Sequence, residues 1–166
     1  MRTFWLTSFA LCAAVLFGAD AGAQQPAPPP SPPPGYGAPI TLDQAKAAAA
    51  AAEAEMKQNG WNQVIAIVGT MGETIYLQKA DLAPNGSIAV AQEKARTSAL
   101  FRVPTKLFHD RLAGGETVVL GIPGVTPLAG AISIMVGGKV IGAIGISGAT
   151  AAQDHQIATA GAAAVK

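Results

Sequence analysis

Short apolar runs alternate with alanine-rich, helix-forming segments along the chain after residue 40. Four of the apolar runs form two pairs, each joined by a short connection that contains glycine. The runs are residues 64–68, 74–78, 131–136 and 139–146. Because connections of this kind join neighbouring antiparallel strands, the pattern predicts two β-hairpins, and Gly137-Gly138 forms the turn of the second.

Cap signals delimit the helices that surround these hairpins. Thr41 is followed three residues later by Gln44, and Thr150 by Gln153, which is the capping-box pattern of a helix start. The expected helices cover residues 41–57, 87–101, 105–112 and 150 onward, and residues 117–120 are expected to add a small strand. The order helix, hairpin, two helices, hairpin, helix predicts an α+β domain with an antiparallel sheet.

Three glycines lie within the last apolar run or just after it, at Gly142, Gly145 and Gly148. A glycine inside a strand marks the close approach of another backbone or of a flat ligand. We expect tight packing at the first two positions. Ser147 and Gly148 precede a helix start, where backbone N–H groups stabilise an anion, so they are candidate ligand contacts. The competing expectation is that Asp154, in the first helical turn, satisfies that end.

The first residues have the pattern of a secretory signal peptide. Arg2 precedes an apolar run, and a small-residue cleavage site ends at Ala23, so we expect residues 1–23 to be removed on export. The expected localisation is periplasmic or secreted, with no membrane span after cleavage. Residues 24–39 are rich in proline and predict an extended linker. The single cysteine, Cys12, lies within the expected signal peptide, so the mature chain can form no disulfide.

Residues 40–166 have the length of one small domain. The whole chain carries a formal net charge of only +1, and 13% of its residues are charged. Its sequence has no basic patch interleaved with aromatic residues. This composition argues against a nucleic-acid partner. High alanine, glycine and valine content with so few charges favours a homo-oligomer. The GxGxxG, P-loop lysine and HExxH motifs are absent from the sequence.

The charged residues of the expected helix 87–101 are the first candidates for ligand binding. Glu93 and Arg96 can pair along one helix face, while Lys94 and Arg102 project elsewhere. One interpretation is an ordinary solvated helix face. The other is a cationic clamp in which Arg96 and Arg102 hold ligand carboxylates, because a guanidinium binds a carboxylate in a bidentate manner.

The chain has two histidines, His109 and His155. His109 is either a solvated surface residue or an axial ligand of haem or a metal, and for His155 we expect the surface role. Neither has partners at the spacing of a zinc site. The sequence shows no Ser-His-Asp arrangement and no paired catalytic carboxylates, so it assigns no catalytic or metal-binding residue.

Six segments carry a likeness to a known family. They are residues 91–99, 104–108, 123–128, 140–148, 153–154 and 158–162. These segments resemble the GlcG/HbpS family of haem-binding proteins, which is related to the PduO C-terminal domain, and the resemblance covers essentially the whole domain. Two positions depart from the usual family pattern: Gly69 stands in place of an aspartate, and Ala131 in place of a glycine.

The resemblance implies a profilin-like fold with a five-stranded antiparallel sheet, assembly into oligomers, and haem as the cofactor. For some exported members it implies haem degradation, or redox sensing with a partner histidine kinase. The haem site expected from it comprises Glu93, Arg96, Phe101, Arg102, Thr105, Phe108, His109, Ser147 and Gly148. In this site the arginines and the helix start bind the propionates, the phenylalanines cover the macrocycle, and Thr105 or His109 approaches the iron.

Two other functions stay open from the sequence. The first is a non-catalytic interaction or sensor subunit that docks through its alanine-rich helices. The second is an accessory enzyme acting on a small organic acid or an aromatic catabolite, for which Glu93 is the residue to test.

Overall fold

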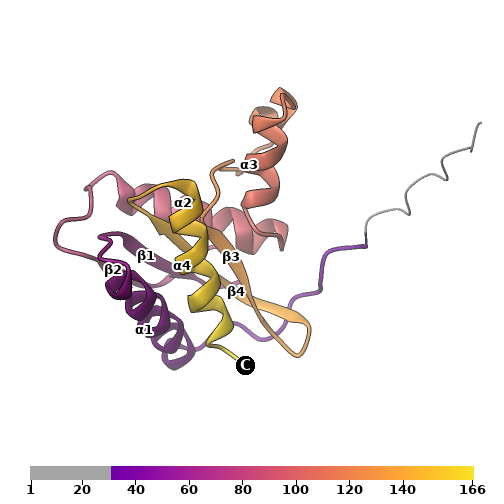
Figure 1. Ribbon diagram of the computed structural model, residues 1–166. Coiled ribbons are helices and arrows are strands. Elements are labelled where there is room, and N and C mark those ends of the chain that lie inside the picture. Colours follow the sequence, from indigo (N-terminus) through magenta and orange to yellow (C-terminus); the bar gives the residue numbers. More distant parts are fainter. Residues whose placement is uncertain (1–30) are drawn as a thin grey trace, which may run out of the picture. The chain divides into compact units, whose positions relative to one another are not determined.

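The computed structural model describes residues 31–166, so the expected signal peptide and the first part of the expected linker lie outside the described residues. The elements are α1 (Leu42–Gln58), β1 (Val64–Val68), β2 (Thr74–Lys79), α2 (Ser87–Phe101), α3 (Lys106–Ala113), the 3-10 helix η1 (Thr117–Gly121), β3 (Ala131–Val136), β4 (Lys139–Ser147) and α4 (Ala151–Ala163) (Figure 1). This order confirms the predicted α+β class with two antiparallel hairpins.

The sheet of the described region has four strands in the order β2-β1-β4-β3, all antiparallel to their neighbours. The expectation of five strands is therefore wrong for residues 31–166. The segment expected as an additional strand lies in η1 instead, because its backbone forms tight local turns. The Val119 N–H donates to the Glu116 carbonyl at 3.2 Å, and the Ile122 N–H donates to the Val119 carbonyl at 3.3 Å.

Helices cover both faces of the sheet. In Figure 1, α1 and α4 lie side by side on one face, while α2 packs on the other face against β1, β3 and β4. The helix α3 packs on η1 and projects beyond these layers. Within residues 31–166, no helix is both long and apolar enough to cross a membrane.

Local signals and burial together explain these elements. Both capping boxes form as predicted: the Gln44 N–H donates to Thr41 Oγ1 at 3.2 Å, and the Gln153 N–H donates to Thr150 Oγ1 at 3.3 Å. The strand β1 is buried along its whole length, which suits its uninterrupted apolar sequence. The small side chains of α1 let that helix lie close to the sheet, with Ala48 and Ala52 fully buried.

The glycines of β4 serve close packing, as expected for Gly142 and Gly145. A Cβ on Gly145 would lie 2.7 Å from the Ala95 nitrogen and still closer to the Ala91 carbonyl oxygen, so α2 rests directly on this strand. A Cβ on Gly142 would meet the Val68 carbonyl oxygen. Neither glycine therefore has room beside it for a ligand.

The last residues of the expected linker contact the domain, and we call residues 34–40 the strap. The Gly37 N–H donates to the Val140 carbonyl at 2.8 Å, and the Val140 N–H donates to the Gly35 carbonyl at 2.9 Å. The Ile40 N–H donates to the Ile141 carbonyl at 2.8 Å. These bonds place the strap along the first residues of β4, at a position where β1 does not pair with that strand.

Candidate functional site

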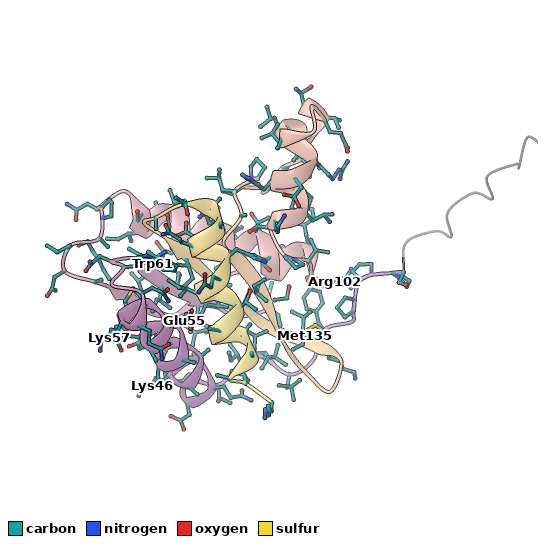
Figure 2. All side chains as sticks on the ribbon, viewed as in Figure 1. Lys46, Glu55, Lys57, Trp61, Arg102 and Met135 are labelled. Atoms are coloured by element: carbon teal, nitrogen blue, oxygen red, sulfur yellow. The ribbon has the colours of Figure 1, made fainter. Side chains whose placement is uncertain are left out.

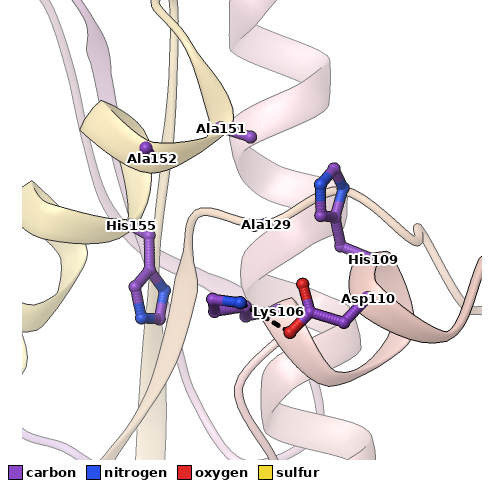
Figure 3. A pocket seen from close by; sticks show the side chains of 7 residues that line it. All are labelled: Lys106, His109, Asp110, Ala129, Ala151, Ala152 and His155. Atoms are coloured by element: carbon purple, nitrogen blue, oxygen red, sulfur yellow. Dashed lines mark hydrogen bonds and ion pairs between the residues drawn. The ribbon is translucent and has the colours of Figure 1, made fainter. Parts of the chain in front are cut away.

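A pocket of about 350 Å³ lies between α3 and the start of α4 (Figure 3). Its lining residues are Lys106, His109 and Asp110 from α3, Ala129 from the loop before β3, and Ala151, Ala152 and His155 from α4. The volume is at the lower end of the range of about 300–1,000 Å³ that is typical of small-molecule sites. Both histidines of the chain line this pocket, so the fold brings together two residues that are 46 positions apart by their printed numbers.

Thr105 ties the start of α3 to β3. Its side chain is fully buried, and its Oγ1 accepts a hydrogen bond from the Ala131 N–H at 3.0 Å. Its own N–H donates to the Ala131 carbonyl at 3.1 Å. The hydroxyl is therefore engaged in holding α3, and Thr105 is absent from the residues that line the pocket.

His155 has an unsatisfied ring nitrogen. Its Nδ1 atom is buried and has no hydrogen-bond partner among the described residues. Burial lowers the pKa of His155 below its usual value, and the positive charge of Lys106 lowers that pKa further, while Asp110 partly opposes both effects. The imidazole is consequently neutral at neutral pH, the state in which a histidine can bind a metal.

Lys106 and Asp110 form an ion pair at the edge of the pocket, with 2.5 Å between Nζ and Oδ2. Both side chains are about half exposed, so the pair contributes little to stability and can open at small cost. The spacing of Lys106, His109 and Asp110 places the three on one face of α3, and this spacing is a signal in the sequence that our prediction did not use. The approach of His155 to that face arises only from the tertiary fold.

The charged residues predicted on α2 lie away from this pocket. Glu93 and Arg96 are both exposed, and within residues 31–166 neither takes part in an ion pair. The Arg96 side chain covers the turn between β1 and β2, because a Cβ on Gly72 would lie 2.7 Å from Arg96 Cγ. The structure therefore does not bring Glu93 and Arg96 together with His109.

Arg102 binds the strap (Figure 2). Its guanidinium carbon lies 5.1 Å from the centre of the Tyr36 ring, and its Nη1 donates to the Pro34 carbonyl at 3.1 Å. The backbone of Arg102 ends α2 in the left-handed conformation, with φ 59°. This arrangement holds the strap against the end of α2. The sequence suggested instead that Arg102 binds ligand carboxylates.

Phe101 and Phe108 pack against each other with an edge-to-face geometry, at 5.4 Å between ring centroids and 78° between ring planes. Phe108 is the buried residue of α3. The two rings therefore join α3 to the end of α2, and neither lines the pocket. Their role in the structure is to position the helix that carries His109.

The backbone before α4 satisfies its polar groups internally. Ser147 is buried, and a Cβ on Gly148 would lie 3.0 Å from the Asn62 carbonyl oxygen. Asp154 Oδ1 accepts a hydrogen bond from the Ala149 N–H at 3.3 Å. Asp154 therefore contacts the backbone at this helix start, as the competing expectation has it, while the ligand contacts at Ser147 and Gly148 stay a prediction.

Behind this helix start lies a buried charged network. Lys94 Nζ lies 2.7 Å from Asp154 Oδ2, and the two side chains are only 4% and 3% exposed. Lys94 also donates to the Ile146 carbonyl at 3.0 Å, and Gln63 Nε2 donates to Asp154 Oδ1 at 2.9 Å. The network connects α2, β4 and α4, and no local signal in the sequence indicates it because Lys94 and Asp154 are 60 residues apart.

Known proteins share this domain. A family model described as "Haem degrading protein HbpS-like" matches residues 40–163. The chain belongs to this family. Protein GlcG of Escherichia coli (strain K12) is 36% identical over 93 residues, which are 56% of this chain and 69% of that protein. The family predicted from the sequence is thereby confirmed.

Two solved structures show the same fold. The HbpS crystal structure has a TM-score of 0.71 and 33% sequence identity, and the match covers 78% of this chain and 92% of that one. A crystal structure of a PduOC–haem complex has a TM-score of 0.69 and 23% identity, and the match covers 77% of this chain and 96% of that one. The second likeness concerns the fold alone.

Gly69, where the resemblance led us to expect an aspartate, has its own arrangement in this domain. Here Gly69 leaves space that the Glu73 carboxylate fills, so that a Cβ on Gly69 would meet Glu73 Oε1. Glu73 Oε2 accepts a hydrogen bond from the Met71 N–H at 3.1 Å. A carboxylate from the start of β2 therefore organises this turn.

The pocket of this HbpS-like domain has donors that suit haem. An imidazole is a ligand for iron, and both His109 and His155 line the pocket, while Lys106 supplies a cation for a propionate at the pocket edge. Apolar walls come from Ala129, Ala151 and Ala152. The pocket is too small to enclose a large ligand completely. The residues present therefore fit a tetrapyrrole of which one edge enters the pocket.

Proposed function

We propose that this HbpS-like protein is an exported haem-binding protein, and that haem enters the pocket between α3 and α4. The observation that carries the proposal is the convergence of His109, His155 and Lys106 on one pocket of ligand size. Two imidazoles and an ammonium group serve the two chemical needs of haem, which are iron ligation and neutralisation of propionates. The description of the matching family as haem-degrading supports this choice of ligand.

Within this proposal each side of the pocket has a separate task. Lys106 would hold a propionate in place of its exposed pair with Asp110, at little cost because the pair is solvated. The small alanine side chains at the start of α4 would leave room for the edge of a macrocycle. When bound, haem supplies the iron chemistry, while these residues bind and orient it.

An absorbance titration with haemin tests the proposal. We expect a saturable Soret band shift at micromolar haemin, and weaker binding in Lys106→Met, whose side chain keeps the volume but lacks the charge. The matched control is Lys57→Met, which removes an exposed cation from α1 that does not line this pocket. Haemin binding that is absent in the wild-type protein, or equal in both variants, would contradict the proposed site.

Export and self-association complete the proposal. The signal-peptide pattern of residues 1–23 supports export, and amino-terminal sequencing of the purified native protein should begin after Ala23. Exposed apolar side chains on α3 and η1 support a homo-oligomer, since Leu107, Val118 and Leu120 are 48%, 68% and 65% exposed. Light scattering should show an oligomer that Leu120→Asp dissociates. A monomer at all concentrations would refute self-association.

A further inference from the structure

The bend between α2 and α3, residues 102–105, contains a strained residue. Arg102 ends α2 with φ 59° and ψ 34°, and among residues 31–166 it is the one residue other than glycine with a positive φ. A residue with a Cβ adopts this left-handed conformation only at a cost in free energy. Such a conformation persists where the surrounding contacts hold it. The contacts of Arg102 therefore show what holds the bend.

The strap supplies the partners of the Arg102 side chain. The guanidinium stacks on the Tyr36 ring at 5.1 Å, and its Nη1 donates to the Pro34 carbonyl at 3.1 Å. Within residues 31–166 it takes part in no ion pair, and its Nε atom is buried without a hydrogen-bond partner. Arg102 therefore depends on the strap, since no carboxylate of the described region holds it.

The strap also caps the last turn of α2. The last carbonyls of a helix have no partner within the helix. The Tyr36 hydroxyl lies 3.0 Å from the Ala99 carbonyl oxygen and 2.9 Å from that of Leu100, so it serves two of these groups. One tyrosine thus contacts both the end of α2 and the guanidinium of the residue that follows it. Loss of the strap would remove both contacts together.

The helix that follows the bend forms one wall of the pocket. α3 begins at Lys106, has one buried side chain, and packs mainly on η1. Thr105 attaches the start of this helix to β3, so the rest of α3 can turn about that point. Lys106 and His109 line the pocket from α3, and the other wall belongs to α4. A change of conformation at Arg102 therefore moves one wall relative to the other.

We infer that the strap is a latch that holds the bend between α2 and α3 and thereby sets the width of the pocket. While the strap is docked, Arg102 keeps its left-handed conformation. When the strap leaves, the Arg102 backbone relaxes and α3 turns away from α4. Coupling of this kind is reciprocal, so a ligand that holds α3 in place also holds the strap. That the ligand is haem rests on the proposed function, whereas the latch itself does not depend on the ligand.

Amide hydrogen exchange of the unmodified protein, followed by NMR, gives the first test. Amides that open in one cooperative unit share one opening free energy. The N–H groups of Gly37 and Ile40 report on the strap, and the Arg102 N–H, which donates to the Ser98 carbonyl at 2.9 Å, reports on the bend. We expect these three amides to have the same opening constant and the same dependence on urea. A bend that opens independently of the strap overturns the inference without any substitution.

Removal of the Tyr36 side chain gives the second test. In Tyr36→Ala we expect the N–H groups of Arg102 and His109 to exchange at least about fivefold faster, because contacts of this size change such equilibria by about 5–30-fold. The control is Tyr76→Phe, which removes a hydroxyl that bonds Gln78 on β2 and should leave both amides unchanged. If Tyr36→Ala frees the strap amides but not those of Arg102 and His109, the strap does not control α3.

Two substitutions at Arg102 test whether backbone strain is what the strap holds. Arg102→Ala and Arg102→Gly both lack the guanidinium, but glycine adopts the left-handed conformation without a steric cost. We expect Arg102→Ala to accelerate exchange of the His109 N–H, while Arg102→Gly stays close to the wild-type rate. In the Arg102→Gly background, Tyr36→Ala should lose most of its effect on α3. Equal rates in Arg102→Ala and Arg102→Gly, or a full effect of Tyr36→Ala in that background, overturn the inference.

A haemin titration connects the latch to the pocket. Tyr36 does not line the pocket, yet we expect Tyr36→Ala to weaken haemin binding, since α3 is no longer held in place. Unchanged haemin affinity in this variant, with faster exchange of the His109 N–H, would show that the latch does not set the pocket. If the wild-type protein binds no haemin, the proposed function is overturned, and the exchange measurements still decide whether the strap holds the bend.

Discussion

The buried pair of Lys94 and Asp154 gives the sharpest test of what holds this fold together. Lys94→Met removes the cation and leaves the Asp154 carboxylate buried, with hydrogen bonds from Gln63 Nε2 and the Ala149 N–H only. Asp154→Ala removes the carboxylate and leaves the buried ammonium group with the Ile146 carbonyl. Breaking one side of such a pair costs about 3–5 kcal/mol, because the remaining charge is uncompensated.

The double variant is expected to be more stable than either single variant. Without either charge, the remaining cost is the loss of partners for the Gln63 amide, the Ala149 N–H and the Ile146 carbonyl. An unsatisfied buried group of this kind costs about 1–3 kcal/mol, and relaxation or water can restore part of it. Two independent effects would instead add to about 6–10 kcal/mol, as much as the whole stability of many small domains.

Urea unfolding followed by circular dichroism measures these differences, with Lys57→Met as the control. Lys57 pairs with Glu53 at 2.7 Å, but the lysine side chain is 71% exposed, so its loss should cost no more than about 1 kcal/mol. If Lys94→Met destabilises no more than Lys57→Met does, the buried network carries no special weight. Additive losses in the double variant would also refute the coupling.

Three further results are expected from the same assay. Tyr36→Phe removes hydroxyl bonds to two α2 carbonyls, including Leu100 at 2.9 Å, and should cost about 0.5–1.5 kcal/mol; no change would mean that the strap is not held in solution. Gly145→Ala should cost about 1–3 kcal/mol or more by overpacking, whereas Gly86→Ala, which has open space, should be nearly neutral. Folding lowers the pKa of His155, so the unfolded chain binds a proton at this imidazole more readily than the folded protein does. The free energy of unfolding is therefore highest above pH about 6.5 and falls as the pH drops through that value. His155→Ala should flatten this slope, and an unchanged slope would contradict the assignment.

Signals that act over a few residues predicted the regular elements well. The two capping boxes at Thr41 and Thr150, and the turn at Gly137-Gly138, each specify a local backbone conformation that does not depend on the rest of the fold. The prediction of a strand at residues 117–120 was wrong because this short apolar run has no partner strand. A run of that length forms a strand only when another strand pairs with it.

The site was harder to predict because it depends on contacts between distant residues. Lys94 reads as a surface lysine until α4 brings Asp154 to it, and Arg102 reads as a free cation until the strap places Tyr36 beneath its guanidinium. His155 reads as a surface histidine until the fold brings Lys106 and Asp110 of α3 to the same pocket. In each case a partner more than 40 residues away, by the printed numbers, changes the chemistry of the side chain.

Two of the segments that resemble the family lie away from the pocket and have a structural role in this chain. Residues 91–99 and 140–148 form the contact between α2 and β4, where Gly145 allows the two backbones to touch and Lys94 reaches Asp154. These segments determine how the layers pack. The pocket instead lies between α3, which projects from that packed body, and the first turns of α4. We therefore expect substitutions of exposed pocket residues such as Lys106 to change binding at the proposed site without unfolding the domain.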